Sequence, residues 1–561
     1  MSIKLLLKPL LAVLLLALLP QAAAAYDFMV GGLCYNKNSD GSVTVTYQYN
    51  SYPSYSNLSG DLVIPATVTY GGGTYSVTTI GYNTFYGCSS LTNVTIPNSV
   101  TSIGYGAFDG CSSMTSVTIG NSVSSIGDNA FHYCSGLTSV TWNAKSCADF
   151  NYNNTLFSSA NTSIKNFVFG NEVEKIPAYL CYELSGLTSV NIPNSVTSIG
   201  NSAFSGCSGL ASVTIPNSVT SIGNSTFYGC SGLASVTIPN SVTAIGNRSF
   251  FGCNGLTSAT IPNSVTSIGS SAFSGCSGLA SVTIPNSVTA IGSWAFDGCS
   301  GLARVTWNAK SCADFTVSPF SSGKTSITCF TFGDEVEKIP AHLCHQLTGL
   351  NSVTIGNSVK SIGSSAFYGC SGLTSVTIPN SVTTIGSWAF DGCSGLASVP
   401  IPNSVTSIGE AAFSYCSGLA SVTIPNSVTS IGNEAFSYCT SLKKAIIGEN
   451  VASIGNKAFY YCSKLEDLVT LRKRPIAIPE NTFEGIPTAS CDLHVPKGSK
   501  ERYEYQDVWK EFLYIIDDAE EFVESGVNPP SGSGVKGDVT GDGSVDIGDV
   551  NAVINIMLGK E

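Results

Sequence analysis

The chain has 561 residues, of which only 11% are charged, and its formal net charge is −12. A typical globular protein is about 25% charged, so most of the polarity here comes from Gly, Ser, Thr and Asn. A hydrophobic content of 43% argues against a disordered polyelectrolyte, and an acidic balance with 25 Lys and Arg argues against a nucleic-acid partner.

Residues 1–25 have the pattern of a signal peptide. Lys4 and Lys8 precede an apolar stretch at residues 10–19, and the alanines at 23–25 provide the small residues that cleavage requires. The apolar stretch is shorter than the roughly 20 residues of a membrane span. We therefore predict a signal peptide at 1–25, no membrane span, and a mature protein that is secreted or held at the cell surface.

Residues 26–57 alternate polar with aromatic or β-branched side chains, as in the run from Val43 to Tyr47. A period of two indicates β-strands. We predict a β-rich N-terminal cap that covers the first unit of the array that follows.

Residues 58–490 are an internal repeat in which cysteines recur every 23 residues, a period that indicates a solenoid. The alternation at 213–215 predicts a short strand, and the Ser- and Gly-rich segment 224–229 predicts a 3₁₀ turn. We expect the strands of 17 stacked coils to join into one parallel sheet. The apolar positions of one unit are Leu210, Val213, Ile215, Val219, Ile222, Phe227 and Cys230.

The repeat from Leu210 to Cys230 reads Leu-x-x-Val-x-Ile-Pro-x-x-Val-x-x-Ile-Gly-x-x-x-Phe-x-x-Cys. It resembles the BspA-type leucine-rich-repeat family of bacterial surface proteins. The resemblance implies a mainly β fold, a right-handed leucine-rich-repeat solenoid of 23-residue coils with a parallel β-sheet and 3₁₀ or turn segments. It also implies an association with adhesion to host matrix proteins and to other bacteria, although a repeat scaffold does not by itself define a ligand.

Two coils are longer than 23 residues, and both begin with Trp-Asn-Ala-Lys-Ser-Cys-Ala-Asp-Phe, at residues 142–150 and 307–315. Each is followed by Glu-Val-Glu-Lys-Ile-Pro. We name residues 142–177 the first cassette and residues 307–340 the second cassette. Because they share this order, we interpret them as copies of one duplicated segment. A tolerated loop insertion is the preferred interpretation of each, and a binding feature is the alternative.

The chain has 20 cysteines, and 13 of them occupy the same position of successive coils. Parallel side chains one coil apart lack the converging geometry of a disulfide, so we expect free thiols that fill the core. The cysteines outside this row, Cys147 with Cys181 and Cys312 with Cys344, recur in both cassettes. For these two pairs the sequence leaves disulfides and free thiols open.

Residues 491–524 are predicted to be a C-terminal cap. A last strand at 493–495 is followed by a more charged, helix-like stretch whose apolar residues can close the core. These residues are Tyr503, Trp509, Phe512 and Ile515. Residues 525–536 have the Gly, Ser and Pro content of a flexible linker.

Residues 537–561 contain a predicted calcium loop, with oxygen-bearing side chains at its first, third, fifth, ninth and twelfth positions. Gly543 stands at the sixth position, where the loop bends sharply, and Ser544 offers its backbone carbonyl at the seventh. Several carboxylates converging on one point indicate Ca²⁺. The side-chain ligands are Asp538, Thr540, Asp542, Asp546 and Asp549.

The loop and the apolar helical pattern after it resemble one repeat of a type I dockerin. A complete dockerin carries two such repeats, and Ile547 and Gly548 stand where cellulosomal dockerins commonly carry a Ser-Thr pair. The resemblance implies either a cohesin-like partner or self-pairing with a second copy of the chain.

No catalytic motif is found, and the four histidines form no metal-ligand set in the sequence. We predict a non-enzymatic binding or adhesion protein that presents a long repeat surface to an extracellular protein or glycan. The alternative is a scaffold component of a polysaccharide-degrading assembly, recruited by dockerin–cohesin interaction. An ice-binding surface is disfavoured because Ser alternates with Thr. The outward hydroxyls include Ser212, Thr214, Ser235, Thr237, Ser281, Thr283, Ser375, Thr377, Ser421 and Thr423.

Overall fold

The structure is a computed structural model that describes residues 26–48, 55, 57–153, 155–322 and 324–524. These residues fall into two compact units, which divide between Leu396 and Ala397. Each unit is described by itself below. The predicted signal peptide at 1–25 and the predicted linker and calcium loop at 525–561 lie outside the described residues.

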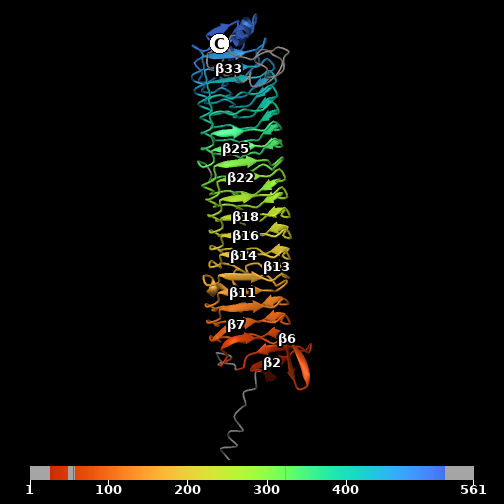
Figure 1. Cartoon of the computed structure of the whole chain (residues 1–561). Helices are drawn as coiled ribbons and strands as arrows, with labels where there is room; N and C mark the ends of the chain where they lie inside the picture. The colour runs from red at the N-terminus through yellow and green to blue at the C-terminus, as the bar shows by residue number, and fades with distance from the viewer. Residues whose placement is uncertain (1–25, 49–54, 56, 154, 323, 525–561) are drawn as a thin grey trace, which may run out of the picture. The chain divides into compact units, whose positions relative to one another are not determined.

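Unit 1 contains parallel strands of three to five residues, one per coil, that lie side by side from β7 to β25 in Figure 1. Neighbouring strands pair 23 residues apart, as Val213 pairs with Val236. We call these the long strands. They are β4 (Gly60–Val63), β7 (Leu91–Thr95), β9 (Ser116–Ile119), β11 (Ser139–Trp142), β12 (Asn166–Phe169), β14 (Ser189–Asn191), β16 (Ser212–Thr214), β18 (Ser235–Thr237), β20 (Ser258–Thr260), β22 (Ser281–Ile284), β24 (Arg304–Trp307), β25 (Cys329–Phe332) and β27 (Ser352–Thr354).

A second set of parallel strands, each of two residues and ending in Ile, follows the turn after each long strand. The sequence predicted one parallel sheet, and that prediction is wrong, because these short strands also pair from coil to coil. They are β8 (Ser102–Ile103), β10 (Ser125–Ile126), β13 (Lys175–Ile176), β15 (Ser198–Ile199), β17 (Ser221–Ile222), β19 (Ala244–Ile245), β21 (Ser267–Ile268), β23 (Ala290–Ile291), β26 (Lys338–Ile339), β28 (Ser361–Ile362) and β29 (Thr384–Ile385).

The interior of each coil contains the apolar residues that the repeat predicts. All seven apolar positions of the coil from Leu210 to Cys230 are buried, with at most 4% of each residue exposed. The phenylalanines stack along the axis of the array, with ring centroids 5.5 Å apart between Phe227 and Phe250 and 5.1 Å apart between Phe250 and Phe273. Burial of one such side chain contributes about 2–3 kcal/mol, so each coil depends on its neighbours for its stability.

The third side of each coil is a run of turns. The 3₁₀ turn predicted at 224–229 is not formed, because Ser225 and Gly229 adopt left-handed backbone conformations with φ of 54° and 68°. Their amides point out of their own coil. The Ser225 N–H donates to the carbonyl of Asn247 at 2.8 Å, and the Gly229 N–H donates to that of Phe251 at 2.7 Å. The turns therefore bind coils together as the strands do.

The cysteine that ends each turn donates its thiol to the preceding coil. The Sγ atoms of Cys230 and Cys253 each lie 3.2 Å from a buried carbonyl oxygen, that of Phe204 and that of Phe227 respectively. The same contact recurs in Cys111, Cys134, Cys276, Cys299 and Cys393 of unit 1 and in Cys439 and Cys462 of unit 2.

All 20 cysteines are free, which confirms the prediction for the 13 in the row. The two pairs left open by the sequence, Cys147 with Cys181 and Cys312 with Cys344, are also free thiols, and all four are buried.

The N-terminal end of unit 1 is an antiparallel group that leads into the array. Strands β1 to β3 pair in order, and β3 then pairs in parallel with β6, which also pairs with β5 and with the first short strand. These strands are β1 (Phe28–Val30), β2 (Leu33–Lys37), β3 (Val43–Thr46), β5 (Thr67–Tyr70) and β6 (Gly73–Ile80). A 3₁₀ turn, η2 (Ser158–Ala160), lies in the first cassette.

Unit 2 repeats the same coil. Its long strands pair in the order β31-β33-β35-β36-β37, and its short strands in the order β30-β32-β34. The elements are β30 (Ser407–Ile408), β31 (Ser421–Ile424), β32 (Ser430–Ile431), β33 (Lys444–Ile447), β34 (Ser453–Ile454), β35 (Asp467–Thr470), β36 (Asp492–His494), α2 (Lys500–Glu504), η3 (Trp509–Glu511), β37 (Tyr514–Ile516) and α3 (Ala519–Glu524).

The end of unit 2 differs from the sequence prediction in one respect. The strand at 492–494 is not the last one, because β37 follows it and pairs with it in parallel. The helix-like stretch is only a short α2 and η3. Its predicted apolar residues are nevertheless buried, with Tyr503 0% and Trp509 1% exposed. Among the described residues, no helix is both long and apolar enough to cross a membrane.

The thiol contact gives a prediction for the buried Cys253. In Cys253→Ala, both the sulfur and the donor to the Phe227 carbonyl are lost, which we expect to lower the free energy of unfolding by about 1–2 kcal/mol. Cys253→Ser should be less destabilising, since its hydroxyl still donates. Urea unfolding followed by circular dichroism measures both, with Cys329→Ala, at a partly exposed cysteine, as the control. If alanine is tolerated better than serine, the thiol acts only as an apolar filler.

Candidate binding surface

The outward residues of the long strands form an exposed surface of hydroxyl groups. In β16 the side chains of Ser212 and Thr214 are exposed while Val213 between them is buried. Parallel pairing places Ser212 beside Ser235 and Thr214 beside Thr237, so serines and threonines form two rows across the strands. All ten outward hydroxyl residues predicted from the sequence are exposed.

We call the outward residues of strands β14 to β22 the Ser/Thr face. None of them is charged, and five strands about 4.8 Å apart give the face a length of about 19 Å. It ends where the cassettes begin, at the 44% exposed Val168 of β12 and at the exposed Arg304 of β24. Its members are Ser189, Asn191, Ser212, Thr214, Ser235, Thr237, Ser258, Thr260, Ser281 and Thr283.

The two cassettes have the same ion pairs. In the first, Lys145 Nζ lies 3.1 Å from Glu174 Oε1, and in the second, Lys310 Nζ lies 3.3 Å from Glu337 Oε1. The other glutamate of each cassette accepts a hydrogen bond from an asparagine amide of an earlier coil. These carboxylates therefore pair with groups of the chain itself. Exposed pairs of this kind contribute at most about 1 kcal/mol each.

One aspartate of each cassette joins the insertion to the next coil. Asp149 accepts the Ala178 N–H at 2.8 Å, and its counterpart Asp314 accepts the Ala341 N–H, also at 2.8 Å. Partial burial raises the pKa of both carboxyl groups, but the amide and a lysine beside each outweigh it and hold both pKa values below the ordinary range. These contacts support the interpretation of the cassettes as structural insertions, and they do not test the alternative.

In unit 2 the outward surface is covered at the C-terminal end. The positions that carry Thr elsewhere are Ile446, Val469 and His494 on β33, β35 and β36. Ile446 and Val469 form a buried cluster with Ala519 of α3, and Phe522 of α3 packs against that cluster. The short helix α3 therefore marks the end of the accessible outward surface of unit 2.

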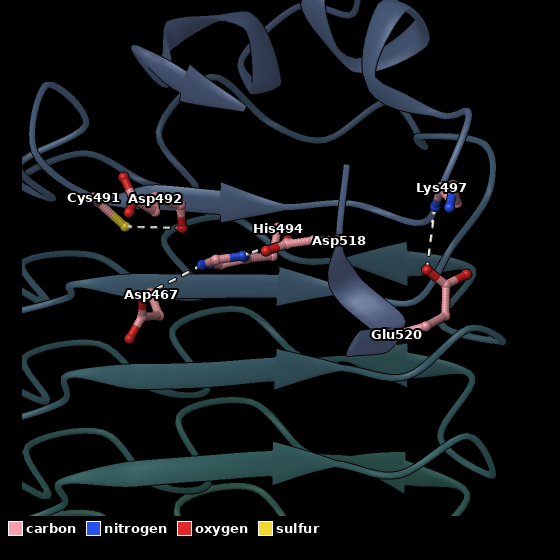
Figure 2. A network of polar contacts seen from close by, with 7 residues as sticks. All are labelled: Asp467, Cys491, Asp492, His494, Lys497, Asp518 and Glu520. Carbon is pink, nitrogen blue, oxygen red and sulfur yellow. Dashed lines mark hydrogen bonds and ion pairs between the residues drawn. The ribbon is translucent and has the colours of Figure 1, made fainter. Parts of the chain in front are cut away.

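The same end of unit 2 contains a polar cluster that the sequence did not predict. Figure 2 shows His494 between Asp467 and Asp518, with Asp492 on the same strand. The Nδ1 atom of His494 lies 2.7 Å from Asp518 Oδ1, and its Nε2 atom lies 3.4 Å from Asp467 Oδ1. Four histidines without a local ligand spacing gave no signal, since strand pairing brings Asp467 opposite Asp492.

The residues predicted to bind Ca²⁺ lie outside the described residues, so their arrangement stays a prediction. They are Asp538, Thr540, Asp542, Ser544, Asp546 and Asp549.

Comparison with known proteins identifies the repeat. A family model described as the BspA type leucine rich repeat region matches residues 73–180, 151–268, 222–344 and 337–466, in six copies. These matches span more than half of the chain. No curated protein is significantly similar to it in sequence.

Several solved structures are similar to the chain. A leucine-rich repeat protein from Bacteroides ovatus is 28% identical, with 75% of this chain and 99% of the other covered and a TM-score of 0.50. A leucine rich cell surface protein from Faecalibacterium prausnitzii is 26% identical over 79% and 94% of the two chains, with a TM-score of 0.25. A leucine-rich repeat protein from Eubacterium ventriosum is 23% identical over 65% and 93%, with a TM-score of 0.33.

The lowered pKa values of Asp149 and Asp314 predict a dependence of stability on pH. A carboxyl group whose pKa is lower in the folded state stabilises the fold above its unfolded pKa of about 3.9, and this contribution is lost as the pH falls through the folded value. Stability should therefore decrease below about pH 4, and less steeply in the double variant Asp149→Asn/Asp314→Asn.

Thermal unfolding measured from pH 7 to pH 3 checks this prediction. Asp334→Asn, at an exposed carboxylate of the second cassette, is the matched control and should keep the dependence of the unmodified protein. Equal slopes in the double variant and the unmodified protein would contradict the assignment.

Proposed function

The chain belongs to the BspA-type leucine-rich-repeat family, and we propose that it is an exported, non-enzymatic protein that binds an extracellular protein or glycan on its Ser/Thr face. The observation that carries the proposal is the exposure of uncharged outward residues in five successive coils, as at Ser235 and Thr237 of β18. Each hydroxyl group is one donor and two acceptors. Such rows suit ligands that themselves present hydroxyl or amide groups at regular intervals.

The packing beneath the Ser/Thr face supports binding without a large loss of conformational freedom. Val236, between Ser235 and Thr237, is only 5% exposed, and β18 pairs with a strand on each side. The backbone under the hydroxyl groups is therefore fixed. Serine and threonine also have short side chains with little rotamer entropy to lose. Both properties reduce the cost of forming a complex.

Two features support a location outside the cell. Residues 1–25 have the pattern of a signal peptide, with Lys4 and Lys8 before the apolar stretch, and the family is one of bacterial surface proteins. Secretion and retention at the cell surface are both compatible with these features. A role in adhesion follows from the same resemblance and is part of the proposal.

We further propose that the tail binds one Ca²⁺ ion and attaches the protein to a partner. The ligands would be five side chains of the loop together with the backbone carbonyl of Ser544, with Gly543 at the bend. Bound Ca²⁺ would offset the repulsion among the carboxylates and order the loop. The partner would be a cohesin-like domain or a second copy of the tail. The side-chain ligands are Asp538, Thr540, Asp542, Asp546 and Asp549.

The second candidate function is a scaffold component of a polysaccharide-degrading assembly. The observation that favours it is the resemblance of residues 537–561 to one dockerin repeat. In that function the tail would recruit the chain through a cohesin, and the solenoid would contact the other components or the polysaccharide. Pull-down with cohesin domains in Ca²⁺ and in chelator separates this function from self-pairing, which sedimentation of the chain alone reports.

The Ser/Thr face gives a binding prediction. The mature chain is tested against immobilised fibronectin, fibrinogen and a panel of glycans, and each ligand that binds is then tested with a triple variant. Long charged side chains in the threonine row should block close approach, so we expect affinity to fall at least tenfold, or by about 1.4 kcal/mol. The substitutions are Thr214→Lys, Thr237→Lys and Thr260→Lys.

The control places the same substitutions on the same coils but away from the Ser/Thr face. Thr220, Thr243 and Thr266 are also exposed and stand just before the short strands. Their replacement by Lys should change affinity less than twofold. Equal losses in the two triple variants, or no loss in either, would contradict binding at the Ser/Thr face.

The tail gives a separate prediction. Asp538→Asn/Asp549→Asn replaces the first and last ligands of the loop, and we expect Ca²⁺ affinity measured by calorimetry on the full chain to fall at least tenfold. Asp507→Asn, an aspartate of the C-terminal cap that pairs with Lys510, is the control. A full-length chain that releases no heat with Ca²⁺ would remove the calcium proposal and leave the Ser/Thr face untouched.

A further inference from the structure

The polar cluster at the end of unit 2 is positioned by two paired strands. Asp467 begins β35 and Asp492 begins β36, and the two residues are direct partners in the parallel register. His494 lies two residues after Asp492, so its side chain points to the same face of the sheet. All three point outward at positions where other coils carry Ser or Thr. Their ligand atoms lie within 4.8 Å of one another.

The tautomer of His494 is indicated by its contact with the residue before α3. Its Nδ1 atom lies 2.7 Å from Asp518 Oδ1, and a carboxylate only accepts hydrogen bonds, so Nδ1 carries the proton that it donates. The remaining nitrogen, Nε2, then has a lone pair free. A histidine that donates one ring N–H to a carboxylate and uses the other nitrogen as a ligand is the usual arrangement in zinc proteins.

The free nitrogen points at another acceptor. His494 Nε2 lies 3.4 Å from Asp467 Oδ1, and a lone pair facing a carboxylate oxygen is repulsive unless a cation or a second proton lies between them. In a tetrahedral site with bonds of about 2.0–2.1 Å, two ligand atoms are about 3.3–3.4 Å apart. The observed separation is therefore that of two ligands of one zinc ion.

The surroundings of His494 leave the carboxylates without a compensating cation. In the described part of unit 2, the ion pairs of Asp467 and Asp518 are those with His494, and none involves Asp492. The ammonium group of Lys444, on the next strand, lies 4.2 Å from the centre of the Phe522 ring instead. Phe522 in turn stacks on His494, with ring centroids 3.7 Å apart, and the histidine is only 3% exposed.

We propose that Asp467, Asp492 and His494 bind one zinc ion at this cluster. His494 and Asp467 are already at ligand spacing, and Asp492 completes the set by a side-chain rotation. Asp518 is a positioning residue that orients the imidazole. One imidazole with two carboxylates favours zinc over calcium and magnesium, which prefer sets made only of oxygen atoms.

The zinc ion would join three segments of unit 2. It links β35 directly to β36, and through the His494–Asp518 contact it holds the segment that begins α3. The same segment is held by Asp517, which accepts the amides of Gly498 and Ser499 at 2.7 Å and 3.1 Å. Zinc binding would therefore stabilise the C-terminal end of the array. This site is separate from the predicted calcium loop and does not depend on the proposed ligand-binding function.

The test uses the full mature chain, stripped with chelator and held in excess Ca²⁺ so that the tail loop is filled. Zinc is added and the unfolding midpoint is measured. Binding to the folded state alone should raise the midpoint of the unmodified protein. In Asp492→Asn, which has nearly the same shape, the rise should disappear. Without zinc this variant should be as stable as the unmodified protein or more stable, because a pair of facing carboxylates is removed.

Two further measurements make the assignment specific. Asp518→Asn should keep the site but weaken zinc binding about 10–100-fold. The visible spectrum of the Co²⁺-loaded protein should show four-coordinate nitrogen and oxygen ligation without thiolate charge transfer, and should be lost in Asp492→Asn. His342→Ala, at a histidine of another coil that lies near His345, is the control and should behave as the unmodified protein.

A midpoint that zinc does not raise would overturn the proposal. So would a rise that persists in Asp492→Asn, since zinc would then bind elsewhere.

Discussion

The structure depends on one constraint, which is that the backbone groups of each coil find their partners on the next coil in one register. The short strands show how little room this leaves. A Cβ atom added to Gly246 would lie 2.7 Å from the backbone of Gly223 one coil earlier, closer than nonbonded carbon atoms approach. Only glycine fits at this corner. The cross-section of every coil is thereby fixed, and the same side chains must fill it each time.

The thiols follow from this constraint. A cysteine at the end of each turn is small enough for the fixed cross-section and donates to a carbonyl of the preceding coil, as Cys230 does to Phe204. Burial raises the pKa of Cys462 to about 12 and keeps the thiols from ionising. Since the interior is fully used for register, variation is confined to the outward residues and the insertions. The first cassette adds four residues and keeps Thr141 paired with Val168.

The sequence predicts the repeated parts well because each apolar position is repeated many times. The buried row from Leu210 to Cys230 and the exposed hydroxyls could be inferred from the period alone. The short strands were missed because two residues such as Ser221 and Ile222 carry no alternation. The 3₁₀ turn was wrongly predicted because the left-handed conformation of Ser225 has no signature in a non-glycine residue. The cluster around His494 depends on which strands pair at the end of the array, so its ligands are far apart in the sequence.

The central claim is that the cysteines hold the coils together as buried, hydrogen-bonded thiols and not as cross-links. Mass spectrometry of the unreduced protein, alkylated before and after denaturation, tests it most directly. The account predicts that all 20 thiols are alkylated in denaturant, and that few react in the native state. A mass corresponding to even one disulfide at full yield in the purified protein, whether at Cys147 and Cys181 or between neighbouring coils, would contradict it.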